Sequence, residues 1–152
     1  MTGKVRRATV VDASRIAEMC FLLWPDATVD EHRIDVESAL LSGMYGTMPA
    51  VTFVAEDDGG VIGFVQVALR SHADGCDMGQ AVAFLEGWFV EERARRNGVG
   101  GALVAAAEAW ARESGCREMA SDTWIDHELS QRAHAALGFE VVDRCVHFRK
   151  SL

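Results

Sequence analysis

The stretch from Phe84 to Trp110, "FLEGWFVEERARRNGVGGALVAAAEAW", constrains the fold more than any other part of the chain. Its first seven residues are apolar or aromatic except for Glu86 and Gly87, which is the composition of a strand buried on both faces. A charged turn follows, and apolar residues then recur at helical spacing until Ser114 and Gly115. The stretch therefore predicts a central strand with a defect at Glu86 and Gly87, then a basic, glycine-bearing loop, then a helix.

The loop between this strand and this helix has the features of an anion site. Gly98, Gly100 and Gly101 leave out side chains where the first free N–H groups of a helix point outward, so a pyrophosphate would fit there. The spacing matches neither G-x-G-x-x-G nor G-x-x-x-x-G-K-[ST], which disfavours a general nucleotide-binding domain. What remains is Arg95-x-x-Gly98-x-Gly100. The alternative explanation of this pattern is a basic helix start with a glycine cap that binds no ligand.

Length and composition favour one soluble domain. The 152 residues suffice for a single core, and no apolar run approaches the length of about eighteen residues that spans a bilayer. The N-terminus lacks an apolar signal core, so we expect a cytoplasmic protein without a membrane partner. The cysteines are far apart and form no C-x-x-C, which indicates neither a metal site nor a disulfide framework. They are Cys20, Cys76, Cys116 and Cys145.

The formal net charge of −8 argues against nucleic acid as a partner and favours a cationic one. Basic residues gather near the glycine loop, at Arg93, Arg95 and Arg96, whereas acidic residues gather in the segment 26–37. An acidic residue taken alone is more commonly just part of a solvated helix face.

Periodicity and turn residues predict the order β-α-α-β-β-β-α-β-α-β-β, an α+β fold in which a mixed, mostly antiparallel sheet carries helices on both faces. Asp12 or Ser14 is expected to cap the first helix, which ends at Pro25. The later helix over 124–137 should turn Leu129, Ala133, Ala136 and Leu137 inward. Strands are expected over 5–11, 50–56, 61–69, 84–90, 118–122, 139–142 and 145–150, with a second helix over about 28–41 and a polar loop over 70–81.

This order, with Arg95-x-x-Gly98-x-Gly100 directly after a strand, resembles the GCN5-related N-acetyltransferases over essentially the whole chain. "FLEGWFV", "GCREMASDT", "LSQRAHAALGFE" and "HFRK", with "LWP" in the first helix, look like the chromosomal type of aminoglycoside 6′-N-acetyltransferase. The resemblance implies one acetyltransferase domain over residues 1–152. It also implies a homodimer that moves the acetyl group of acetyl-CoA to the 6′-amine of an aminoglycoside antibiotic and so confers resistance.

The resemblance also implies site residues. The substrate-pocket positions fall on Trp24, His72, Glu86, Asp122 and Asp143. His127 stands where close relatives have Asn, and Asp143 stands where some have Glu, so both contacts depart from the family pattern. The coenzyme contacts fall on Trp88, Phe89, Val90, Arg95, Arg96, Asn97, Gly98, Val99, Gly100, Gly101 and His127.

The residue types suit this chemistry without the family. An aminoglycoside is a polycation, so its site should offer carboxylates and an aromatic surface, as Glu86, Asp122, Asp143 and Trp24 do. A carboxylate inside an apolar strand is costly unless it is paired or used, which makes Glu86 the sharpest candidate. Its alternative is an ion pair with an arginine of the same chain. Asp122 is equally well explained as a turn or helix cap.

Acetyl transfer needs a neutral amine, a polarised thioester carbonyl and a proton for the leaving thiolate. Glu86, directly or through water, is the candidate proton acceptor, with Asp122 as its substitute, and the strand break at Gly87 would free an N–H for the developing oxyanion. His134 lies four residues before Gly138, where many family members have a tyrosine. It would protonate the thiolate, contact the sulfur, or serve only as a polar residue on a helix face.

Two other functions fit the sequence. A related acetyltransferase would act on a polyamine or a protein N-terminus, because an acidic pocket suits these amines nearly as well. A non-catalytic coenzyme A-binding module is the second, and the presence of Trp24, Glu86 and Asp122 counts against it.

Overall fold

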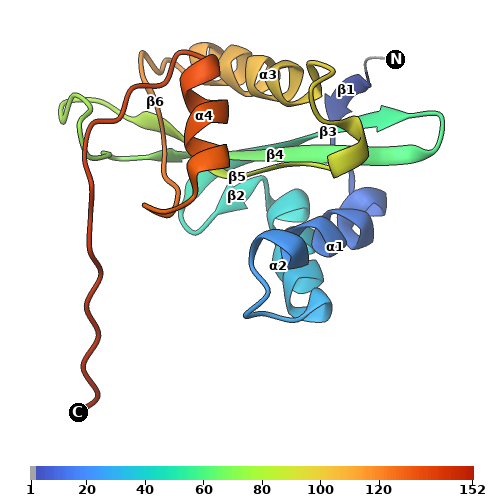
Figure 1. Cartoon of the computed structure of the whole chain (residues 1–152), viewed down its shortest axis with the longest axis horizontal. Coiled ribbons are helices and arrows are strands. Elements are labelled where there is room, and N and C mark those ends of the chain that lie inside the picture. The colour runs from blue at the N-terminus through green and yellow to red at the C-terminus, as the bar shows by residue number, and fades with distance from the viewer. Residues whose placement is uncertain (1–2) are drawn as a thin grey trace.

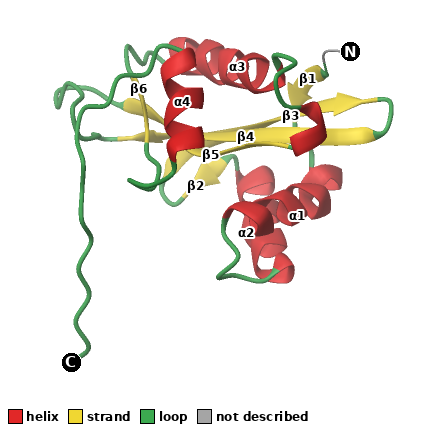
Figure 2. Ribbon diagram, viewed as in Figure 1, coloured by secondary structure: helices red, strands yellow, loops and turns green. Residues whose placement is uncertain are grey.

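The computed structural model describes residues 3–152 and is organised around a six-stranded sheet (Figures 1 and 2). Neighbouring strands are antiparallel except for the last pair, which is parallel, so the predicted mixed, mostly antiparallel sheet is confirmed. The main path runs in the order β1 (Lys4–Arg7), β3 (Met48–Asp57), β4 (Gly60–Arg70), β5 (Val82–Val90) and β6 (Met119–Ser121), while β2 (Met44–Tyr45) pairs with β3.

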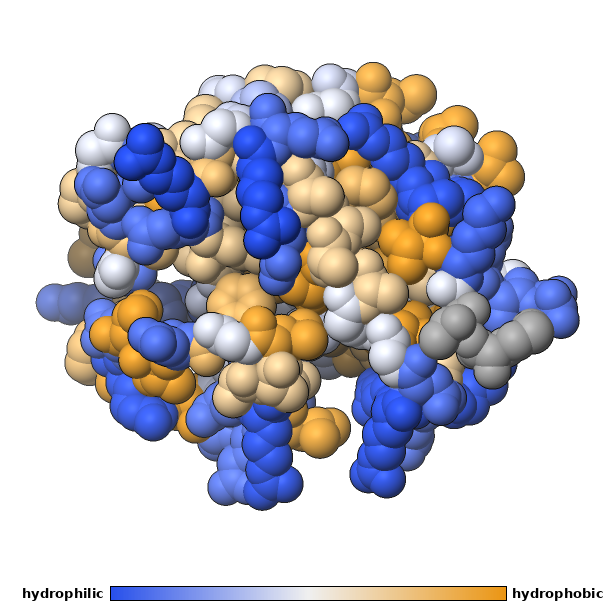
Figure 3. Space-filling model, turned by 90° about the horizontal axis from the view of Figure 1, so that it is seen from above, coloured by the Kyte–Doolittle hydropathy of each residue, from blue (hydrophilic) through white to orange (hydrophobic). Residues whose placement is uncertain are grey.

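Helices cover both faces of the sheet, as predicted. The helices α1 (Ala13–Leu23) and α2 (Val29–Ser42) lie below it in Figure 1, and α3 (Val99–Glu113) lies above it, next to α4 (Glu128–Ala136). Two short 3-10 helices, η1 (Val10–Asp12) and η2 (Glu92–Ala94), precede α1 and the glycine loop. Seen from above, the α3 side shows pale, weakly apolar residues alternating with strongly hydrophilic ones (Figure 3).

Two apolar cores lie on opposite faces of the sheet, which is why β4 and β5 are apolar along most of their length. The larger core packs Leu103 and Ala107 of α3 against Val65, Val67 and Leu85. The smaller core, under α1, is formed by Ile16, Met19, Cys20, Val54 and Phe64.

Helix boundaries follow the local capping chemistry. Thr28 caps α2, because its hydroxyl accepts the Glu31 N–H at 3.1 Å while the Glu31 carboxylate accepts the Thr28 N–H at 2.7 Å. Gly43 ends α2 with φ 67°, a left-handed conformation that favours glycine. The predicted second helix is therefore confirmed.

The N-terminal prediction needs two corrections. The strand expected over 5–11 stops at Arg7, and η1 begins at Val10. Asp12 is the N-cap residue of α1, but its carboxylate forms no capping hydrogen bond with the helix, because it accepts two hydrogen bonds from the Arg6 guanidinium at 2.8 and 2.9 Å. This partner holds the pKa of Asp12 below its usual range.

The C-terminal prediction was wrong in a larger way. No strand forms over 139–152, and this segment extends away from the sheet (Figure 1), with every residue after Phe139 exposed. Leu129 and Ala136, expected to face inward, are exposed as well, whereas Leu137 packs against the larger core. A strand needs a neighbour to accept and donate its hydrogen bonds, and the segment has none in residues 3–152.

The remaining features bear on function classes. Among the described residues 3–152, no helix is both long enough and apolar enough to cross a membrane. Over the same range, no three His, Cys, Asp or Glu side chains gather where they could hold a metal ion. The four cysteines are free thiols, and only Cys145 is exposed.

Candidate active site

A β-bulge on β5 places the first carboxylate of the site. Gln66 of β4 pairs with Gly87 and the next residue, Val67, pairs with Leu85, so Glu86 is an extra residue without an opposite partner. The defect predicted in this strand is confirmed. Because a bulge bends its strand and redirects a side chain, it explains how a carboxylate fits into an otherwise apolar strand.

The second carboxylate lies beside the first because β5 and β6 part at this point. Their parallel pairing ends with Leu85 opposite Ser121, and the next residues on the two strands are Glu86 and Asp122. Asp122 is exposed and forms no hydrogen bond or ion pair with the described part of the chain. The strand gap thus brings together two carboxylates that are 36 residues apart in the sequence.

Glu86 is not free, because Arg70 holds it. The Arg70 Nε donates to one carboxylate oxygen at 2.9 Å and a terminal nitrogen donates to the other at 2.8 Å. The guanidinium carbon also lies 3.5 Å from the centre of the Phe84 ring. An ion pair within the chain, the alternative reading of Glu86, is therefore present. Sequence reasoning missed Arg70, whose only signal is a charge at the end of an apolar strand.

The negative charges of Glu86 and Asp122 change the pKa values of neighbouring side chains. The pKa of Arg70 is raised chiefly by its hydrogen bond with Glu86, and Asp122 raises it further. Burial raises the pKa of Tyr45, and the negative charge of Glu86 adds to this shift. Tyr45, at the end of β2, is thus close enough to Glu86 to be affected by its charge.

Trp24 covers the bulge from the α1 side. A Cβ added at Gly87 would lie 2.8 Å from Cη2 of Trp24 and 3.2 Å from Cε2 of Phe64, so the missing side chain makes room for the indole. The Trp24 carbonyl also lies 2.9 Å from Nε2 of His32 on α2. Trp24, which was predicted to lie in the substrate pocket, therefore lies against Gly87, the residue that follows Glu86.

Two predicted pocket residues lie outside this group. His72 is exposed in the loop between β4 and β5, where its Nδ1 lies 3.0 Å from the Ser71 hydroxyl. Asp143 is exposed in the C-terminal segment, and its carboxylate accepts the Arg144 N–H at 2.7 Å. No hydrogen bond or ion pair within residues 3–152 joins either of them to Glu86 or Asp122.

The glycine loop has the geometry of an anion site at its helix end. Gly98 is the N-cap of α3, with φ 79°, and offers no side chain to the first N–H groups. A Cβ at Gly98 would meet no atom within 4 Å, so the space outside the helix start is open. Arg96, with φ 66°, holds the turn that aims the chain into the helix. Asn97 is exposed in the same turn.

An unpaired donor lies next to this helix start. The indole Nε1 of Trp88 is buried and has no hydrogen-bond partner in the described residues. A Cβ added at Gly100 would lie 3.1 Å from the same ring, so Gly100 leaves the space into which the indole fits. Buried hydrogen-bond donors in proteins nearly always have an acceptor. A polar group of a ligand bound beside α3 would supply the acceptor for the indole N–H of Trp88.

His134 joins the end of α4 to the strand gap. Its Nδ1 lies 2.7 Å from the Ser130 carbonyl oxygen, which only accepts, so this nitrogen carries the proton. In the neutral ring, Nε2 then accepts from the Ser121 hydroxyl at 2.7 Å. The ring also meets Trp88 edge-on, with the ring centres 5.3 Å apart. His127, by contrast, is exposed at the start of α4, and its side chain forms no hydrogen bond with the described residues 3–152.

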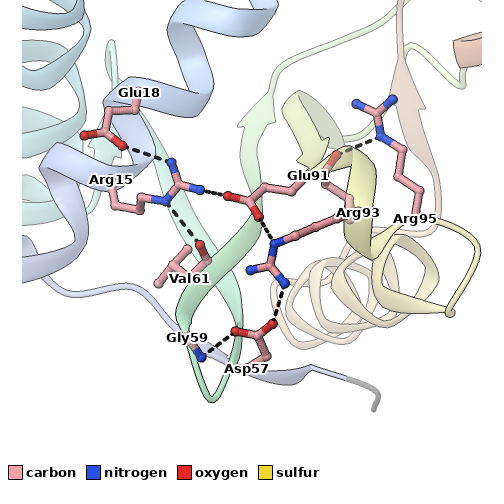
Figure 4. Close-up of polar contacts among 9 residues, drawn as sticks. Arg15, Glu18, Asp57, Gly59, Val61, Glu91, Arg93 and Arg95 are labelled. Atoms are coloured by element: carbon pink, nitrogen blue, oxygen red, sulfur yellow. Dashed lines mark hydrogen bonds and ion pairs between the residues drawn. The ribbon is translucent and has the colours of Figure 1, made fainter.

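A network of ion pairs fixes the base of the glycine loop (Figure 4). Glu91, just after β5, pairs with Arg15 of α1 and with Arg93 of η2, and Arg93 reaches Asp57 in the β3–β4 turn at 3.0 Å. The Arg95 Nε forms no ion pair but donates a hydrogen bond of 2.8 Å to the carbonyl of Val90, the last β5 residue. A cleft of about 470 Å³ opens beside the network and is lined by Leu22, Phe89, Glu91, Glu92, Arg93 and Arg95.

Comparison with known proteins agrees with this geometry. The sequence model of the Acetyltransferase (GNAT) family matches residues 16–139. The aminoglycoside N(6')-acetyltransferase type 1 of Klebsiella aerogenes is 44% identical over 148 residues, which cover 97% of this chain and 96% of that protein. The protein of the same name from Stenotrophomonas maltophilia is 38% identical over 148 residues, which cover 97% of this chain and 93% of that protein.

Solved structures give the same result. AAC(6')-Iy in complex with the bisubstrate analog CoA-S-monomethyl-acetylneamine is 35% identical, covers 100% of both chains and superposes with a TM-score of 0.86. AAC(6')-Iy in complex with CoA is 36% identical, with a TM-score of 0.87 over 98% of this chain and 95% of that chain. The resemblance seen in the sequence is thus confirmed, and the chain belongs to the GNAT family of acetyl-CoA-dependent acetyltransferases.

Proposed function

We propose that this protein is an aminoglycoside 6′-N-acetyltransferase that transfers the acetyl group of acetyl-CoA to the 6′-amine of aminoglycoside antibiotics and so confers resistance. The observation that carries the proposal is the strand gap at Glu86 and Asp122, because the residues that follow Glu86 on the same strand, Gly87 and Trp88, pack against Trp24 and against Gly100 of the glycine loop. The cationic acceptor and the anionic coenzyme would thus bind at separate sites, each of which carries the opposite charge. The relatives named above support this acceptor rather than another amine.

In this proposal the glycine loop holds the coenzyme. The N–H groups of Val99, Gly100 and Gly101 at the start of α3 would bind its pyrophosphate, since a helix N-terminus favours negative charge. Acetyl-CoA supplies the activated acetyl group at the thioester. The backbone of Trp88, Phe89 and Val90 would bind the arm that carries it, and Arg96 and Asn97 extend the loop. Roles for Arg95 and His127 are weaker, because Arg95 is engaged with Val90 and His127 belongs to the start of α4, not to the loop.

The carboxylates divide the acceptor chemistry between them. Glu86, held by Arg70, would orient the reacting ammonium and take its proton, and the unpaired Asp122 would bind a further ammonium or take that proton instead. A backbone N–H left unpaired by the bulge at Glu86 would stabilise the oxyanion. His134 would hand a proton to the thiolate only after its ring is charged, since Nε2 of the neutral ring is an acceptor. Direct contacts from His72 and Asp143 would require a rearrangement of their segments.

The acceptor is tested by measuring acetyl-CoA consumption with a kanamycin-like aminoglycoside, its analogue with a 6′-hydroxyl, and a polyamine. We expect turnover with the 6′-amine, and at least about tenfold lower kcat/KM with the polyamine, because an ammonium fixed by two carboxylates gains from charge-assisted hydrogen bonds that a flexible chain satisfies less well. Equal activity on the 6′-hydroxyl analogue would contradict the regiochemistry. Coenzyme binding without turnover of any acceptor would support the non-catalytic module instead.

We further propose a cytoplasmic homodimer that binds neither nucleic acid nor membranes. Free thiols support the location, and the net charge of −8 supports the absence of a phosphate-backbone partner. The dimer is supported by two groups of apolar side chains that are exposed to solvent. Val146 and Phe148 in the C-terminal segment are 70% and 94% exposed, and Trp124 and Leu129 near the start of α4 are 69% and 59% exposed. One copy's segment, whose sequence reads as strands, would cover the other copy's α4 and the open edge of β6.

A charged residue introduced at an apolar position of the C-terminal segment is expected to dissociate this dimer. Phe148→Glu should shift the protein to monomer in light scattering after size exclusion, because a buried unpaired carboxylate is costly. Val11→Glu is the matched control, since Val11 is 87% exposed but lies on η1, away from the segment. A dimer that survives Phe148→Glu, or a wild-type monomer, would contradict the proposed arrangement.

A further inference from the structure

The acceptor site contains a cation of its own. Arg70 lies within a group that otherwise offers carboxylates and aromatic rings, and it engages Glu86 through two parallel hydrogen bonds of 2.9 and 2.8 Å. The Glu86 side chain is 10% exposed, whereas that of Arg70 is 43% exposed. Solvent screens a pair with one partner this open, so its contribution to stability is small, and its geometry matters more.

Three contacts fix the Arg70 side chain. Its backbone pairs with Val82 at the end of β4, its guanidinium stacks on Phe84, and its fork meets Glu86. All three partners belong to β5, the strand that carries the bulge. A bulged residue lacks a ladder partner of its own, so the orientation of its side chain must come from a neighbouring group, and here that group is Arg70.

The fork leaves part of the carboxylate available. A carboxylate offers about four lone-pair positions, and a bidentate guanidinium occupies two of them, one on each oxygen. The other two point away from the guanidinium. The acceptor amine therefore meets a carboxylate whose plane and free edge are already set, which lowers the entropy that must be lost when the amine binds.

We propose that Arg70 is a positioning residue for the acceptor, acting through Glu86 by holding its carboxylate in one orientation at the bulge. The inference rests on the proposed function, because it takes the ammonium of the acceptor as the group that Glu86 meets. Arg70 itself does not touch the reacting atoms. Its removal should weaken the use of the acceptor and leave the use of acetyl-CoA unchanged, since the glycine loop belongs to a different part of the site.

The test is a double-mutant cycle of Arg70→Met and Glu86→Gln. Arg70→Met should lower kcat/KM for the acceptor about tenfold or more, with an unchanged KM for acetyl-CoA, because one hydrogen-bonded charge partner is lost. In the Glu86→Gln background the same change should add less than about twofold, because residues that act as one unit are not additive. Arg70→Lys should restore only part of the activity, since it keeps the charge and loses the fork.

Arg33→Met is the matched control. Arg33 is 37% exposed and pairs with Glu37 at 3.0 Å on α2, so this variant removes a comparable ion pair outside the bulge. A merely structural Arg70 would give a lower melting temperature and kinetics per folded molecule like those of Arg33→Met. Millimolar methylguanidinium should raise the activity of Arg70→Ala and leave that of Arg33→Ala unchanged.

Arg70→Met kinetics equal to the control, or effects of Arg70→Met and Glu86→Gln that multiply, would overturn the inference. The wild type is assayed first with the aminoglycoside and the polyamine, so failure of the proposed function is seen separately as a change of preferred acceptor. The cycle is then run with that acceptor. If no acceptor turns over, the four proteins of the cycle, which are the wild type, Arg70→Met, Glu86→Gln and the double variant, are compared by calorimetric titration with the aminoglycoside. Equal affinities of these proteins for the aminoglycoside overturn the inference.

Discussion

Glu86→Gln is expected to lower kcat roughly 100-fold, the usual size of a lost general base. The amide keeps the shape of the carboxylate at the bulge but neither accepts a proton nor attracts an ammonium. It also turns an NH₂ group toward a nitrogen of Arg70, which has only donors, so one of the two hydrogen bonds of 2.9 and 2.8 Å is lost. Turnover, acceptor affinity and melting temperature must therefore be measured on the same variant.

The three quantities separate the roles of Glu86. A base lowers kcat at saturating acceptor. A residue that only binds raises the acceptor KM and leaves kcat largely intact, and a purely structural ion pair lowers the melting temperature alone. Asp122→Asn is the comparison, because Asp122 is the neighbouring carboxylate without a partner in the described residues. If Glu86→Gln keeps its kcat while Asp122→Asn loses about 100-fold, Asp122 is the base.

The parts of the site that could be predicted from the sequence are those made by adjacent residues. The buried strand, its break at Glu86, the glycine loop and the helix from Val99 are all contained in one continuous stretch, and the structure confirms each of them. Apolar periodicity and glycine position report directly on such local structure. Periodicity and glycine position do not show which distant residues contact Glu86 and Gly87 at this break.

Arg70 and Trp24 show what the sequence alone did not reveal. Arg70 reaches Glu86 only because β4 and β5 are antiparallel and the bulge shifts their register by one residue. Trp24 reaches Gly87 because α1, below the sheet in Figure 1, crosses β5 near the bulge, so that a Cβ at Gly87 would lie 2.8 Å from the indole. Neither the register shift nor the helix crossing leaves a periodic signal, so the ion pair was foreseen only as an alternative without a named arginine.

The C-terminal segment illustrates a different limit. The residues over 139–150 have strand composition, yet strand propensity describes how well a residue fits a half-buried pleated surface. Such a surface needs a neighbouring strand, and none is available to this segment within residues 3–152. A strand pattern without a partner in its own chain is what the proposed second copy would satisfy.

The second large effect is expected at the glycine loop. Gly98→Val should raise the KM for acetyl-CoA about tenfold or more, because hydrogen bonds to a charged group, worth about 1.5–3 kcal/mol, are blocked by a branched side chain at the helix start. The site favours such a block: a Cβ at Gly98 meets no protein atom within 4 Å, so the new side chain would extend into the space proposed for the pyrophosphate.

Backbone strain complicates any substitution at Gly98, and the same helix supplies the control. Gly98 has φ 79° and Gly115, just beyond the other end of α3, has φ 85°, and a Cβ at either position would meet nothing within 4 Å. A valine in the left-handed region costs about 1–3 kcal/mol at either glycine. Gly98→Val and Gly115→Val should therefore lower the melting temperature alike, while only the first weakens acetyl-CoA binding in calorimetry. Equal coenzyme affinity in the two variants would show that the N-terminus of α3 does not hold the pyrophosphate, since strain and helix are shared and only the position relative to the loop differs.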